Sequence, residues 1–182
     1  MTLVLLFGLS SCAFAQTPDI TGVWSINAAL SDNTDKRVEA ALRAAGEKIQ
    51  SSWFDRRKDR YRGGPAEQEL YDRMSYDSTL RISLDADADA YDFTYADAFS
   101  RLVYTDNRSH SVSLNALDTA ADFSLGHWEG EVFKVEAHPR DGGYAEESYR
   151  LSNGGKQLHV ELYILPRAFR EAITLKRVYD KQ

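Results

Sequence analysis

Hydrophobic and polar residues alternate along much of the chain after residue 80, and this period of two is typical of half-buried β-strands. The run 173–179 shows the pattern clearly, because Ile173, Leu175, Arg177 and Tyr179 share one face of an extended strand. Short polar turns separate the other segments of this kind. The segments predicted as strands are 20–26, 80–84, 91–95, 102–104, 112–114, 123–128, 132–135, 144–151, 157–165 and 173–179.

These strands and their short connections predict a mainly β fold. We expect an antiparallel up-and-down barrel or a strongly curved sheet of about 8–10 strands, with a two-sheet sandwich as the alternative. Residues 16–182 are long enough to bury a sizeable core, so we predict a single domain over that range.

The hydrophobic period changes to that of a helix between residues 31 and 75, directly after the first predicted strand. Apolar residues recur at three- and four-residue spacing over 38–49, and Ser31 or Asp32 can cap the N-terminus of this helix. A second, shorter helix is predicted over 65–74. The sequence therefore predicts two helices inserted after the first strand.

The connector between the predicted helices, 55–64, holds five cationic and two anionic residues and ends in two glycines. We interpret it as a solvated linker, and the alternative is a loop that binds a polyanion. The chain as a whole carries a net charge of −6, which disfavours nucleic acids and anionic membrane surfaces as partners.

The first fifteen residues form an apolar run that ends in small residues, which is the pattern of an export signal. We expect cleavage after Ala15, which would give a periplasmic or secreted protein. Residues 9–12 resemble a lipobox, so the alternative product is a membrane-anchored lipoprotein acylated at Cys12. The run is too short for a transmembrane span and no second apolar stretch follows it. Cys12 is the only cysteine, so we expect no intramolecular disulfide.

One acidic motif begins like a calcium-binding loop but lacks two of the residues that such a loop needs. Asp85, Asp87 and Asp89 are spaced like the start of a calcium loop, but Ala90 and Ala96 occupy the positions where such a loop needs glycine and glutamate. We therefore interpret this segment as a solvated turn between two strands.

Other residues that carry chemistry are scattered. The four histidines lack the spacing of metal ligands, and no Gly-x-Ser-x-Gly nucleophile elbow is present. Glu146 and Glu147, like Glu129 and Glu131, could form acid and base pairs, and we interpret them as solvent-facing residues of the strands. The sequence predicts no metal, no cofactor and no catalytic activity.

The Gly-x-Trp strand at 22–24, the helix pair, the meander of strands and the closing Lys-Arg-Val-Tyr at 176–179 together resemble the calycin superfamily of lipocalins and fatty-acid-binding proteins. The chain also resembles exported bacterial proteins of uncharacterised function with lipocalin-like barrels. In the fatty-acid-binding branch, an Arg-x-Tyr on the last strand holds the ligand carboxylate, which would correspond to Arg177 and Tyr179. In lipocalins a late arginine packs over a tryptophan, which would pair Arg177 with Trp24.

An arginine on an apolar face needs a partner, and three candidates remain open for Arg177. They are a ligand carboxylate, a protein carboxylate and the ring of Trp24. If the ligand role holds, Arg177, Tyr179 and Trp24 are the binding residues of a cell-envelope protein for an apolar or amphipathic small molecule. The alternative is a protein-protein interaction or inhibitor module of the envelope, with a solid core and a functional outer surface.

Overall fold

The computed structural model describes residues 17–44, 78–96, 98, 100–112, 122–138, 142–166 and 171–182 of the chain. The described residues form ten strands, one α-helix and a short 3-10 turn. Their bounds are β1 Gly22–Ile26, α1 Thr34–Ala44, β2 Thr79–Asp85, β3 Ala90–Tyr95, β4 Ser100–Tyr104, β5 His110–Val112, β6 Asp122–Glu129, β7 Val132–His138, β8 Gly143–Ser152, η1 Asn153–Gly155, β9 Gln157–Pro166 and β10 Ile173–Lys181.

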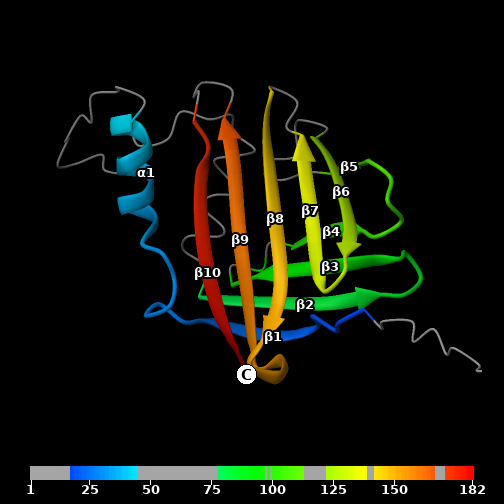
Figure 1. Ribbon diagram of the computed structural model, residues 1–182. Coiled ribbons are helices and arrows are strands. Elements are labelled where there is room, and N and C mark those ends of the chain that lie inside the picture. Colours follow the sequence, from blue (N-terminus) through cyan, green and yellow to red (C-terminus); the bar gives the residue numbers. More distant parts are fainter. Residues whose placement is uncertain are drawn as a thin grey trace, which may run out of the picture.

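All ten strands belong to one antiparallel sheet with the order β4-β3-β2-β1-β10-β9-β8-β7-β6-β5. The first and last strands of the chain pair with each other, so β1 joins β2 on one side to β10 on the other. In Figure 1, β1 to β4 cross β7 to β10, and the strongly curved sheet folds back on itself. The predicted mainly β, antiparallel barrel is confirmed.

The barrel nearly closes where β4 meets β6, and Gly126 lies at this seam. An added Cβ at Gly126 would lie 2.6 Å from the carbonyl oxygen of Tyr104 and 2.7 Å from Cγ1 of Val103. Real Cβ atoms do not approach other atoms so closely, so glycine is the residue that allows the two strands to touch.

The inner face of the barrel carries the core. On β10 the predicted inner face is confirmed, since Ile173, Leu175, Arg177 and Tyr179 are all buried while Thr174 and Lys176 are exposed. Val178 lies on the opposite face and is also buried, so the alternation in burial ends there. The same period of two buries one face of β7, β8 and β9. Burial of these side chains is the main favourable contribution to folding.

The helix α1 begins after a side-chain cap. The Oδ1 atom of Asn33 accepts a hydrogen bond from the backbone N–H of Lys36 at 3.0 Å. The predicted caps, Ser31 and Asp32, were therefore wrong by one or two positions. Both residues instead hold the β1–α1 connection to β10, because Ser31 Oγ accepts from Val178 N and Asp32 Oδ2 accepts from Lys176 N.

Several predicted features lie outside the described residues. They are the export signal 1–15 with Cys12, the second helix 65–74 and the basic connector 55–64. Among the described residues, no helix is long and apolar enough to cross a lipid bilayer.

Candidate functional site

Arg177 lies on the inner face of β10, and its side chain is bound to the connection between β1 and α1. Its Nη1 donates to the backbone carbonyl oxygens of Asp32 at 2.8 Å and Lys176 at 3.0 Å, and its Nη2 donates to Oγ1 of Thr34. These acceptors were not among the three partners considered from the sequence. They hold the start of α1 against β10, and the ligand role of Arg177 stays a prediction.

Trp24 is fully buried on β1, next to both β2 and β10. Its Nε1 donates to the carbonyl oxygen of Ile20 at 3.1 Å, so the one polar atom of the ring is satisfied. The ammonium of Lys181 lies over this ring, with its Nζ 5.1 Å from the ring centroid. Tyr179 is also buried, and the binding roles of Trp24 and Tyr179 likewise stay predictions.

A different arginine forms a polar cluster inside the barrel. Arg101 of β4 reaches across the interior to Glu147 of β8, and its Nη2 lies 2.7 Å from Oε1 and 2.6 Å from Oε2 of that carboxylate. Nε of Arg101 donates to the hydroxyl of Tyr95 at 3.0 Å. The hydroxyl of Tyr149 donates to Oε2 of Glu147. We call these four residues the interior polar cluster.

The interior polar cluster is almost completely removed from water. The side chains of Arg101 and Glu147 are 3% and 0% exposed. Burial would lower the pKa of Arg101, but the charge of Glu147, together with Tyr95, Tyr149 and the hydrogen bonds to Glu147, holds that pKa well above its ordinary value. Burial, followed by the charge of Glu147, raises the pKa of Tyr149 well above its ordinary value, so its hydroxyl stays protonated as a donor.

One nitrogen of the cluster is left over. Nη1 of Arg101 is buried, and within the part of the chain that the structure describes it has no hydrogen-bond acceptor. A guanidinium carries two N–H groups on this nitrogen, so both are unsatisfied. Because buried donors are nearly always paired, this nitrogen is a candidate donor to a bound molecule.

Aromatic rings surround the cluster. The guanidinium carbon of Arg101 lies 5.5 Å from the ring centroid of Phe93, and Phe93 packs against Tyr149 at 5.1 Å. Farther along the same layer, Tyr91 and Phe133 meet edge to face at 5.0 Å. These contacts join β3 directly to β7 and β8, so aromatic rings fill this end of the barrel and keep the local dielectric low.

Beyond the cluster, the inner face of the sheet becomes aliphatic. Glu147 is flanked in register by Val135 on β7 and Leu162 on β9. Two residues along β8, Ala145 lies between Ala137 and Ile164. The polar cluster therefore continues into a buried apolar wall that carries two small side chains.

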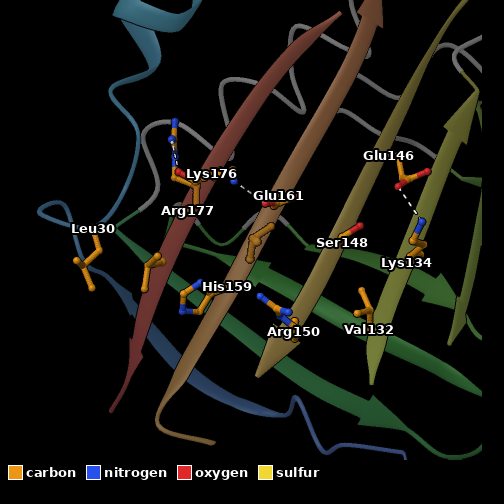
Figure 2. A pocket seen from close by; sticks show the side chains of 12 residues that line it. Leu30, Val132, Lys134, Glu146, Ser148, Arg150, His159, Glu161, Lys176 and Arg177 are labelled. Carbon is orange, nitrogen blue, oxygen red and sulfur yellow. Dashed lines mark hydrogen bonds and ion pairs between the residues drawn. The ribbon is translucent and has the colours of Figure 1, made fainter. Parts of the chain in front are cut away.

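The outer face of β7 to β10 holds a separate groove of about 650 Å³ (Figure 2). At one end Arg150 lies opposite His159, with Val132 and Val178 on the flanking strands. Leu30, from the β1–α1 connection, also lines the groove. The groove is amphipathic and open to solvent.

The centre of this groove is formed by short or paired side chains. Ser148 lies between Lys134 and Glu161 in register. Lys134 pairs with Glu146 at 3.2 Å, and Lys176 pairs with Glu161 at 3.1 Å (Figure 2). We call the outer surface around Ser148, Arg150 and His159 the outer groove.

Sequence reasoning missed the interior polar cluster, and for Glu147 it was wrong. Glu147 is not a solvent-facing residue, because its side chain is fully buried. The signal was present in the alternation of β8, which places Glu147 on the same face as Ala145 and Tyr149. Arg101 precedes the segment predicted as 102–104, so its inward direction was not recognised. Among the described residues, no group of histidine, cysteine, aspartate or glutamate side chains could hold a metal ion.

No protein-family model matches the chain, and no curated protein matches it by sequence. Solved structures share its fold, among them the following two. A mutant of the fluorescent protein UnaG is 15% identical, with a TM-score of 0.53 over 89% of this chain and 95% of that one. Secretory abundant heat soluble protein 4 from Ramazzottius varieornatus is 16% identical, with a TM-score of 0.52 over 92% and 98%. At this identity the likeness shows the fold alone, and the fold is a calycin-like β-barrel.

Proposed function

We propose that the chain is a binding protein for an apolar or amphipathic small molecule, which it holds inside the barrel without catalysis. In this proposal the protein works in the cell envelope, either periplasmic or secreted, or anchored through an acylated Cys12. The observation that carries the proposal is the unsatisfied Nη1 of Arg101, a buried donor next to the apolar inner wall of the barrel.

A buried donor without a partner costs about 1–3 kcal/mol, so an acceptor that reached Nη1 would gain a favourable hydrogen bond. In this proposal the rest of the molecule contacts the aliphatic residues next to Glu147, including the small side chains of Ala137 and Ala145. A ligand that offers one acceptor and a larger apolar part matches both features.

The residues predicted from the resemblance have a place in this proposal. Arg177, Tyr179 and Trp24 lie buried in the same interior, and Arg177 is separated from Tyr149 by a single strand in register. We propose them as a secondary set of ligand contacts. The hydrogen bonds from Arg177 to Asp32 and Thr34 support the competing structural role.

Native mass spectrometry of the protein purified from its own cells tests the proposal. We expect a releasable small mass on the wild type, which is lost in Arg101→Met and retained in Arg150→Met. The second substitution is a matched control, because it removes an arginine from the outer groove. A folded wild type with no bound mass, before and after incubation with a cell lipid extract, would count against the proposal. So would a bound mass that Arg101→Met leaves unchanged.

A second candidate function is the protein-protein interaction or inhibitor module. It is supported by the ring contacts that fill one end of the barrel, together with the outer groove of about 650 Å³. A photo-crosslinking residue at position 148 tests it, with position 87 in the β2–β3 turn as the control. The module predicts one adduct of discrete mass at 148 alone, which Arg150→Glu abolishes. Equal labelling at both positions would argue against it.

A further inference from the structure

We infer that the polar group of the bound molecule is a neutral hydrogen-bond acceptor, such as a ketone, aldehyde or ester carbonyl, and not a carboxylate. This inference rests on the proposed binding function and names the chemical class of its ligand. It follows from two features of the interior polar cluster, which are its balance of charge and the set of nitrogen atoms already in use.

The first feature is charge. Arg101 and Glu147 carry opposite charges, with Nη2 of the arginine 2.6 Å from Oε2 of the glutamate. Both side chains are excluded from water. A ligand carboxylate at Nη1 would place a second negative charge on the same guanidinium, close to Glu147. In a medium of low dielectric this repulsion is not screened, whereas a neutral carbonyl adds a hydrogen bond without adding charge.

Arg177 is also buried near this interior, but it does not change the charge balance of the interior polar cluster. Arg177 directs both of its Nη atoms to Asp32 and Thr34. The carboxylate of Asp32 lies close by. Its partial burial would raise its pKa, but hydrogen bonds and the positive charges of Arg37 and Arg177 together outweigh this and lower that pKa. Arg177 therefore has its own anionic neighbour at the start of α1.

The second feature is geometry. A carboxylate normally binds arginine through two parallel hydrogen bonds that use two different nitrogen atoms. In Arg101, Nε is bound to Tyr95 and Nη2 is bound to Glu147, which leaves Nη1 alone. Each edge of the guanidinium that could accept a two-oxygen ligand includes one of the occupied nitrogens. A single carbonyl oxygen needs only Nη1.

Calorimetric titration with two matched pairs of compounds tests the inference. The pairs are methyl laurate against laurate, and acetonaphthone against naphthoate, so that each pair differs mainly in the polar group. We expect the wild type to bind the neutral member at least about tenfold more tightly, since tenfold is a modest effect for adding an unscreened like charge.

Glu147→Gln should reverse this preference, because it leaves Arg101 with an uncompensated positive charge. Glu146→Gln is the matched control, since Glu146 is the adjacent residue of β8 and faces the outer groove, where it pairs with Lys134. This control should keep the preference of the wild type. If Glu147→Gln does not fold, the wild-type comparison still decides.

The outcomes separate the two proposals. Equal or tighter binding of the acids by the wild type would overturn the inference and leave the binding function standing. An unchanged preference in folded Glu147→Gln would also overturn it. Failure of the folded wild type to bind any of the four compounds would overturn both.

Discussion

Removing both partners of the Arg101 and Glu147 pair should destabilise the barrel by clearly less than the sum of the two single removals. The two side chains are 3% and 0% exposed, and the carboxylate oxygens lie 2.6 and 2.7 Å from Nη2. Breaking a buried pair by deleting one partner costs about 3–5 kcal/mol, because the remaining charge is left without compensation. We therefore expect Arg101→Met and Glu147→Leu each to lower the free energy of unfolding by about this amount.

In a domain of this size such a loss corresponds to a fall in melting temperature of roughly 6–20 °C, at about 2–4 °C per kcal/mol. The double variant removes both charges and leaves the hydroxyls of Tyr95 and Tyr149 without their charged partners. Each such hydroxyl lowers the free energy of unfolding by about 1–3 kcal/mol. Its loss should stay clearly below the sum of the two single losses, which is about 6–10 kcal/mol.

Urea unfolding at neutral pH, followed by tryptophan fluorescence, measures all three variants against the wild type. The Lys134 and Glu146 pair on the outer face is the control, because its side chains are 25% and 27% exposed and its removal should change stability by less than about 1 kcal/mol. Losses that simply add in the double variant would refute the reasoning, as would single losses no larger than those of the control.

Three further predictions concern the scaffold. Gly126→Ala should lower stability by about 1–3 kcal/mol in urea unfolding, because its Cβ would lie 2.6 Å from the carbonyl oxygen of Tyr104; a change within error would mean that the seam adapts freely. Asp32 has a pKa below its ordinary value of 3.8, so its stabilising contribution is present above that value and is lost as the pH falls through the lowered folded-state pKa. Unfolding experiments from neutral to acid pH should show a steeper loss in the wild type than in Asp32→Asn, and parallel curves would contradict this. Lys181→Gln should lower stability by about 0.5–1 kcal/mol and alter the emission of Trp24, whereas unchanged stability would show that the cation over this ring contributes nothing.

The strands could be predicted because their signal is local. On β10 the alternation from Ile173 to Tyr179 depends only on which residues face the core, and the structure buries all four residues of the predicted inner face, with Val178 of the outer face buried as well. The cap of α1 was misplaced because Ser31, Asp32 and Asn33 are all good caps, and the choice among them depends on contacts with β10 that are distant in sequence.

The interior polar cluster could be only half predicted. Glu147 shares the buried face of β8 with Ala145 and Tyr149, so the period of two alone places its carboxylate inside. The assumption that charged residues face solvent concealed this. Its partner is 46 residues away on another strand, and only the fold of the whole barrel brings Arg101 to it.

The seam and the cluster depend on one strand, and this links the closure of the barrel to its interior chemistry. Arg101 and Val103 lie on the same inward face of β4, two residues apart. Val103 lies against Gly126 of β6 at the seam, while Arg101 reaches Glu147 of β8. A displacement of β4 away from β6 would therefore also move the guanidinium of Arg101 away from the carboxylate of Glu147. The two buried charges would then be incompletely paired. Because that pairing is strongly distance-dependent in a low dielectric, the Arg101 and Glu147 contact favours the closed position of β4. The Arg101 and Glu147 contact therefore has two effects. It leaves Nη1 of Arg101 without a partner among the described residues, and it stabilises the closed barrel around this nitrogen.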